Sequence, residues 1–170
     1  MFSSDRILAL NVGASKIVLA EFAVKSGRAP ELTNYGMSEL GTDPDNETSI
    51  GTHLVAAVRE IMKTRGIRPA PLMLSLSGQM VFPRFVRLPA VSEDKLLQMV
   101  QYEVEQNVPF PMNEIVWNHQ FIGDDSSGEQ GAMIVAAKIE NVHAVTDRVV
   151  EAGLEPEVVD VAPMALYNCL

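Results

Sequence analysis

The chain has 170 residues and a formal net charge of −9, which argues against a nucleic-acid-binding surface and against direct binding to an anionic membrane. Its single cysteine, Cys169, excludes an internal disulfide and fits a reducing compartment. No apolar run is long enough to span a bilayer and the first residues lack a signal-peptide pattern, so we expect a cytoplasmic protein with one domain or two small ones.

The first half of the sequence predicts an antiparallel meander, a helix and a strand. Three β-rich runs, at Arg6–Val12, Lys16–Val24 and Glu31–Leu40, are separated by short turns, as in a meander. Apolar residues at helical spacing then predict a helix over Glu47–Arg65. The short apolar run Pro71–Ser77 is typical of a strand that is buried on both faces.

The following residues predict a compact unit with the order strand, helix, strand, strand, helix. The strand Val81–Leu88 opens this unit, and a strongly patterned helix follows it. Two more strands, at Glu114–Ile122 and Gly131–Lys138, flank an exposed hairpin-type loop at residues 123–128. The unit closes with a helix over Glu140–Ala152, after which glycine and leucine resemble a Schellman ending.

The first helix of this unit has one predicted buried face. That face carries Leu96, Val100, Val104 and Val108, with Leu97 beside them. Ser92 is the expected N-cap, because its side-chain oxygen can accept a hydrogen bond from an unpaired amide of the first turn. Pro109 ends the helix, since the residue before a proline avoids the α region.

The last predicted elements are a strand at Glu157–Val161, which returns to the first layer, and a mostly apolar helix at Met164–Leu170. No further predicted element follows that could pack against the apolar side of that helix. We therefore interpret the fold as interrupted, and we expect that this helix can support a homodimer.

The turn between the first two β-rich runs is a candidate phosphate site. Gly13, Ala14 and Ser15 can direct several backbone amides at one spot, which suits phosphate oxygens. Lys16 would add a positive charge, and Asn11 a polar side chain at the end of the strand. A plain hairpin turn is the alternative interpretation, since the segment is not a Walker motif.

Metal and acid–base chemistry have little support in the sequence. His53, His119 and His143 lie in different predicted elements and lack ligand spacing. Glu103 and Glu105 are two residues apart on a helix, so their carboxylates do not face each other. We therefore predict no metal site and no catalytic residue.

Five short motifs occur in a combination and order that chance does not explain. They are Arg84-Phe-Val-Arg-Leu-Pro89, Glu103-Val-Glu-Gln-Asn-Val-Pro-Phe110, Val135-Ala-Ala-Lys138, Ala152-Gly-Leu-Glu-Pro156 and Val159-Asp-Val161. With these motifs the chain, from about Arg6 to its end, resembles the N-terminal part of the PilM family, which comprises cytoplasmic actin-like proteins of type IV pilus assembly. The FtsA proteins of bacterial division are a more distant resemblance.

The resemblance implies an α/β fold of the actin-like (ribonuclease H-like) class. Residues 1–80 and 154–170 would form subdomain 1A, and residues 81–153 an inserted βαββα subdomain 1C. The fold would be incomplete, because it would end before the second phosphate loop and the adenosine pocket of the family.

The resemblance also assigns the turn after the first strand as the family's first phosphate loop. ATP and Mg in the complete protein would then be bound by Asn11, Gly13, Ala14, Ser15 and Lys16. Asn11 stands where the family usually has an acidic residue that helps to hold magnesium, and Val18 stands where relatives often carry lysine. We expect no cofactor and no catalysis in this chain alone.

The function implied by the resemblance is a scaffold at the inner membrane. PilM-like proteins bind the short cytoplasmic N-terminal tail of a membrane-anchored partner, PilN, in a groove between 1A and 1C, and they meet the membrane only through partners such as PilN and other platform proteins. The expected contact residues are Arg84, Phe85, Arg87, Tyr102 and Glu103. Two structural alternatives are a core position for Phe85 and an ordinary ion pair between Arg87 and Glu103.

Two other functions fit the same class of fold. The chain could be a lobe of an active actin-like ATPase or phosphotransferase, because of its phosphate-loop-like turn. It could also be the cytoplasmic domain of a related type II secretion protein.

Overall fold

The computed structural model describes residues 5–40, 47–122 and 128–168. Residues 41–46, between the third predicted strand and the first predicted helix, lie outside the described residues, as do most of the loop predicted at 123–128 and Cys169.

The chain divides into two compact units. The first unit contains Met1–Gly78 and His143–Leu170, and the second contains Gln79–Val142. The resemblance implied subdomain bounds after residues 80 and 153, and these bounds stay a prediction. The second boundary between the compact units falls inside helix α3 (Ile139–Glu151), so most of this helix belongs to the first unit.

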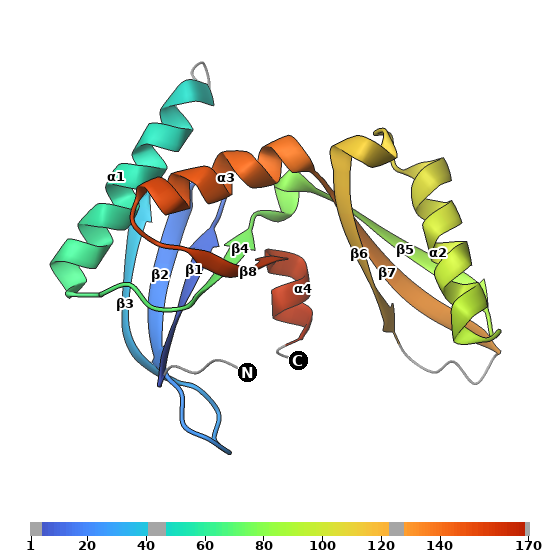
Figure 1. Cartoon of the computed structure of the whole chain (residues 1–170), viewed down its shortest axis with the longest axis horizontal. Coiled ribbons are helices and arrows are strands. Elements are labelled where there is room, and N and C mark those ends of the chain that lie inside the picture. Colours follow the sequence, from blue (N-terminus) through green and yellow to red (C-terminus); the bar gives the residue numbers. More distant parts are fainter. Residues whose placement is uncertain (1–4, 41–46, 123–127, 169–170) are drawn as a thin grey trace. The chain divides into compact units, whose positions relative to one another are not determined.

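The first unit is built on a five-stranded sheet with the order β3-β2-β1-β4-β8 (Figure 1). Its strands are β1 (Arg6–Val12), β2 (Lys16–Ala23), β3 (Glu31–Glu39), β4 (Leu72–Leu76) and β8 (Pro156–Val161). The first three strands are antiparallel neighbours, which confirms the predicted meander. Strand β4 is parallel to β1, and β8 is parallel to β4, so the chain returns to the first layer as predicted.

One face of this sheet is packed against helix α1 (Glu47–Arg65). The fully buried side chains of the sheet are Leu8, Leu10, Ile17, Leu19, Leu72, Leu74 and Leu76. Gly36 lies on the same face and permits close approach of α1, because a Cβ there would lie 2.6 Å from Cγ2 of Ile61. The alternate residues Met73 and Ser75 are only half-buried, so the prediction that this strand is buried on both faces is wrong.

Glycines in the left-handed conformation end two of the helices of this unit. After α1, Gly66 has a φ of 64°, and the amide of Ile67 donates a hydrogen bond to Met62 O at 2.9 Å. After α3, Gly153 has a φ of 98°, and the amide of Leu154 donates to Val149 O at 3.1 Å. The second arrangement is the predicted Schellman ending, in which glycine avoids the penalty of a Cβ atom.

The second unit is an antiparallel sheet with the order β5-β7-β6 and a helix on one face (Figure 1). Its elements are β5 (Val81–Pro89), α2 (Glu93–Asn107), β6 (Ile115–Ile122) and β7 (Glu129–Lys138), with short 3-10 turns η1 (Gly78–Met80) and η2 (Met112–Glu114) before β5 and β6. With α3 following β7, the predicted order of strand, helix, strand, strand and helix is confirmed.

The core of the second unit lies between α2 and the sheet. Its buried members are Val86, Leu88, Leu96, Val100, Val104, Val108, Ile115, Ala132, Ile134 and Ala136. The predicted helical stripe is therefore confirmed, except that Leu97 is 41% exposed because it lies one position off the stripe. The side chain of Ser92 makes no capping hydrogen bond, and its backbone carbonyl accepts instead from Lys95 and Leu96.

Helix α4 (Ala162–Tyr167) follows β8 and has proline in its first turn, as predicted. It has no buried residue, and Leu166 and Tyr167 are exposed. A homodimer formed through this helix stays a prediction.

Candidate functional site

Two neighbouring residues of β5 lie on opposite faces of the second sheet. Arg84 pairs in the register with Ile134 of the core and therefore lies on the α2 side. Phe85 lies on the other side, where its ring is 3.2 Å from the position of a Cβ on Gly131. Because side chains alternate along a strand, Arg87 shares the face of Phe85. The five residues predicted for partner contact are therefore divided between two faces.

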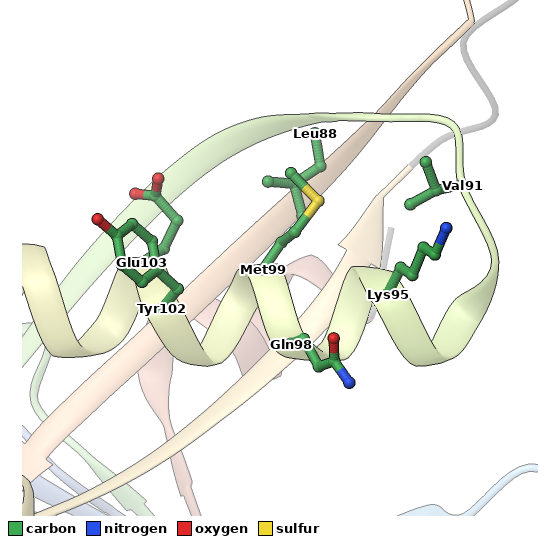
Figure 2. A pocket seen from close by; sticks show the side chains of 7 residues that line it. All are labelled: Leu88, Val91, Lys95, Gln98, Met99, Tyr102 and Glu103. Carbon is green, nitrogen blue, oxygen red and sulfur yellow. The ribbon is translucent and has the colours of Figure 1, made fainter.

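On the α2 side, a groove of about 500 Å³ runs between the helix and the end of β5 (Figure 2). Its lining comprises Leu88, Val91, Lys95, Gln98, Met99, Tyr102 and Glu103. Figure 2 shows Met99 directed from α2 toward Leu88, with Val91 on the connection between β5 and α2. Tyr102 is 61% exposed, so its ring is available to an incoming molecule. The groove thus has an apolar floor and polar ends.

The far end of this groove is fixed by an ion pair. Nε of Arg84 lies 3.6 Å from Oε2 of Glu103, and the same oxygen accepts a hydrogen bond from Nδ2 of Asn107 at 2.9 Å. The pair connects β5 to α2, so Arg84 holds in place Glu103, which lines one end of the groove.

The other predicted contact residues lie on the open face of the sheet. Phe85 is 52% exposed, so the alternative of a core position for it is wrong. Nη1 of Arg87 lies 3.9 Å from Oε2 of Glu129, and both side chains are largely exposed. The expected pair between Arg87 and Glu103 is wrong, because the two residues belong to opposite faces of the sheet.

In the first unit, the predicted phosphate turn joins β1 to β2. The amide of Gly13 donates a hydrogen bond to Lys16 O at 3.0 Å, and a Cβ on Gly13 would lie 2.9 Å from that oxygen. Ala14, Ser15 and Lys16 are exposed. Within the described residues, the amides of Ala14 and Ser15 donate no backbone hydrogen bond to another element. These amides can therefore donate hydrogen bonds to an anionic ligand.

Sheet register brings two further polar residues into line with Asn11. Asn11 of β1 pairs with Ser75 of β4, and Ser75 pairs with Asp160 of β8. Each is the last but one residue of its strand, and the three strands are parallel. They therefore lie in one row at the carboxyl ends of the strands, where open α/β sheets bind ligands. Ser75 and Asp160 were not predicted as site residues from the sequence, although each is a polar residue near the end of a predicted strand.

Two features are absent from the described part of the chain, a metal-binding group and a membrane-spanning helix. Residues 5–40, 47–122 and 128–168 contain no group of three or more His, Cys, Asp or Glu side chains that could hold a metal ion. Among the helices of these same ranges, none has the length and apolar character that crossing a bilayer requires.

Comparison with known proteins identifies the family. The model of the family described as "Type IV pilus assembly protein PilM" matches residues 9–170, nearly the whole chain. The chain belongs to the PilM family. This confirms the resemblance seen in the sequence motifs.

Two solved structures support this assignment of family and fold. A chain of the PilM–PilN type IV pilus biogenesis complex is 28% identical, with a TM-score of 0.75 over 95% of this chain and 49% of that chain. The cytoplasmic domain of EpsL, an inner-membrane component of the Vibrio cholerae type II secretion system, is 14% identical, with a TM-score of 0.57 over 92% of this chain and 57% of that chain. This chain thus spans about half the length of each.

These similarities confirm the predicted fold class, a partial actin-like α/β fold. The likeness to EpsL concerns the fold alone. The prediction that a partner tail lies between the two units stays a prediction.

Proposed function

We propose that this chain is a scaffold of the type IV pilus assembly platform, and that it binds the short cytoplasmic N-terminal tail of a membrane-anchored PilN-like protein. The scaffold would lie in the cytoplasm, peripheral to the inner membrane, and the partner would connect it to that membrane. Other platform proteins are further candidate partners.

The observation that carries this proposal is the similarity to a chain of the PilM–PilN complex. The match has a TM-score of 0.75 and extends over 95% of this chain, so it includes both units. The second unit also offers surfaces suited to a peptide: an apolar groove beside α2, and an exposed aromatic ring and arginine on the other face of β5. Aromatic and arginine side chains are the types that most often dominate binding energy at interfaces.

A calorimetric titration of the chain with a synthetic PilN-like N-terminal peptide, without nucleotide, tests the proposal. We expect saturable binding that Arg87→Ala and Tyr102→Ala each weaken by about fivefold to tenfold, the effect of losing one useful interface contact. Arg28→Ala and Tyr35→Ala are matched controls, since both residues are exposed in the first unit, and they should leave the affinity unchanged. Absence of binding by a folded sample would contradict the scaffold function.

A second candidate function is contact of the first unit with the phosphates of a nucleotide. The specific observation in its favour is the row of Asn11, Ser75 and Asp160 beside the turn with unpaired amides. Asp160 would supply the carboxylate that Asn11 lacks. Oδ1 of Asp160 already accepts a hydrogen bond from the amide of Val161 at 2.7 Å. Carboxylate and amide oxygens suit a magnesium ion that keeps several of its waters. The residues present therefore fit the phosphate end of Mg-ATP.

This second proposal is tested by NMR of the isotope-labelled chain during addition of Mg-ATP. We expect chemical-shift changes at the amides of Ala14, Ser15 and Lys16, and smaller changes in Asp160→Ala. Unchanged spectra at millimolar nucleotide would contradict phosphate contact at this turn.

A further inference from the structure

Strand β5 has one unpaired edge whose hydrogen-bonding groups can be assigned residue by residue. Among the described residues, β5 pairs only with β7, over a register without shifts from Val81 to Pro89. The amide of Ala90 continues this register and donates to Gly128 O at 2.9 Å. Because backbone groups alternate between the two sides of a strand, even-numbered residues of β5 bond to β7 and odd-numbered residues point outward.

The two prolines of β5 support this assignment. Pro83 and Pro89 are both odd-numbered, and proline is tolerated in a sheet where its missing amide would face away from the neighbouring strand. Between them, Phe85 and Arg87 direct their amides and carbonyls outward. Within the described ranges, no strand pairs with this edge and no backbone hydrogen bond uses these two amides. The edge therefore exposes the backbone amides and carbonyls of Phe85 and Arg87, and an added strand can pair with this two-residue window.

The groove beside α2 lies next to the same edge. A strand added there would place every second side chain on the α2 side of the sheet. On that side stand Leu88 of β5 and the α2 residues Lys95, Met99 and Tyr102, which lie at helical spacing. The groove would therefore receive the apolar side chains of the added strand. Its remaining side chains would lie beside Phe85 and Arg87 on the open face.

Two cations give this window a charge preference within an acidic chain. The guanidinium of Arg87 is 71% exposed, and its only described ion pair has a long distance of 3.9 Å. Lys95 has no carboxylate within ion-pair distance among the described residues. An acidic residue opposite Arg87 is thus complementary. A second copy of β5 would instead bring another arginine to the window.

We propose that an extended, acidic-apolar segment of a partner protein binds the second unit by adding an antiparallel strand to the free edge of β5. This inference rests on the proposed peptide-binding function and names its recognition mode. The segment carries an acidic residue opposite Arg87 and a β-branched residue opposite Phe85. The residue between these two and the residue before the acidic one are apolar. Their side chains enter the groove beside Met99 and Tyr102. Its chain direction follows the antiparallel pairing of the rest of the sheet.

The peptide Ser-Leu-Asp-Val-Ile-Ser, acetylated and amidated, is a direct probe of this mode. Its Asp and Ile would face Arg87 and Phe85, and their amides would donate to the carbonyls of β5. Its Leu and Val amides would point to solvent. N-methylation of Asp or Ile should weaken binding about tenfold by removing a hydrogen bond and crowding the edge, whereas N-methylation of Val should change it less than about twofold. Equal effects of the two methylations would overturn the proposal.

Hydrogen exchange and charge reversal give independent readouts. Peptide binding should slow exchange of the Phe85 and Arg87 amides, whereas the amide of Val116 on the opposite edge strand should be unaffected. Arg87→Glu should weaken binding of the Asp peptide and strengthen binding of a peptide with Lys in its place. Gln106→Ala, on an exposed position of α2 outside the groove, is the control variant.

The failure of this inference is distinguishable from failure of the proposed function. If a PilN-like tail binds but leaves the Phe85 and Arg87 amides unprotected, the scaffold function stands and strand addition is wrong. Protection that rises with protein concentration in the absence of peptide would also overturn the inference, because it would mean that a second copy occupies the edge.

Discussion

Nε of Arg84 lies 3.6 Å from Oε2 of Glu103, and this pair joins β5 to α2 at one end of the groove. Both side chains are partly exposed, at 39% and 28%, so solvent screens their attraction. The Nε atom of Arg84 is itself buried and has no hydrogen-bond partner among the described residues. The arrangement therefore positions the groove wall more than it stabilises the fold.

We predict that Glu103→Ala lowers the free energy of unfolding of the second unit by only about 0.5–1 kcal/mol, as for other partly exposed pairs. The fluorescence of Trp117, the one tryptophan of the chain, reports urea unfolding of this unit. Glu105→Ala is the matched control, because in the described part of the chain this exposed residue accepts a hydrogen bond only from Gln101 on the same helix. A loss above about 3 kcal/mol would mean that the pair behaves as a buried one.

Close packing between Gly36 and Ile61 gives a second prediction, for the first unit. A Cβ on Gly36 would lie 2.6 Å from Cγ2 of Ile61 and 3.1 Å from Cγ of Arg65. Gly36→Ala should therefore lower the free energy of unfolding by about 1–3 kcal/mol through overpacking. Met37→Ala, at the exposed neighbouring position, should have little effect. Circular dichroism during urea unfolding measures both.

A double-mutant cycle isolates the contact itself. Ile61→Ala removes the atom that Gly36→Ala would meet, so the double variant should be less destabilised than the sum of the single variants, by about 1 kcal/mol. Additive effects would mean that α1 shifts away from β3 without strain.

Sequence periodicity predicted the elements of this fold because each element has one buried face with a simple period. Val100 and Val104 of α2 were predicted as core residues on spacing alone, and both are buried. Leu97 was wrongly included, because hydrophobicity does not reveal a position one residue off the stripe. Ser92 occupies the predicted N-cap position, but the rotamer of its side chain depends on the local turn.

The two candidate sites differ in how much of them the sequence could reveal. Ser75 and Asp160 join Asn11 only through the register of parallel strands, and that register is set by residues far apart in the chain. Arg84 and Phe85 were grouped as one surface, although the alternation of side chains along β5 already separates their faces. In this second case the signal was present in the predicted strand.

The turn at Gly13 allows a prediction for both the stability of the first unit and its contact with Mg-ATP. Gly13→Ala places a Cβ 2.9 Å from Lys16 O, the oxygen that accepts the amide of residue 13. Relief of this clash must move backbone, so we expect a loss of about 1–3 kcal/mol in stability. The Mg-ATP-dependent shifts of the neighbouring amides should also fall, as NMR would show. Ala14→Gly removes a side chain from the exposed part of the same turn and should preserve those shifts.

Phe110 ends one of the motifs that carry the resemblance, and the structure gives it a packing role. Its ring is packed against the core of the second unit, and Nζ of Lys138 lies 5.0 Å from the ring centroid. The same Nζ donates to Oε1 of Glu140 at 3.0 Å. Phe110→Leu should therefore lower the free energy of unfolding by about 1 kcal/mol.

A double-mutant cycle separates the cation–π contribution of Lys138 to stability from the packing contribution of Phe110. In a cycle of Phe110→Leu with Lys138→Met, we expect a coupling free energy of about 0.5–1 kcal/mol, the strength of a partly exposed cation–π contact. Glu140→Gln is the control, because it changes the charge beside Nζ without touching the ring. Neither Phe110→Leu nor Lys138→Met should alter the affinity for a PilN-like peptide more than about twofold, since neither side chain lines the groove or the free edge of β5. A larger loss of affinity in Phe110→Leu, with stability little changed, would mean that the motif contacts the partner directly.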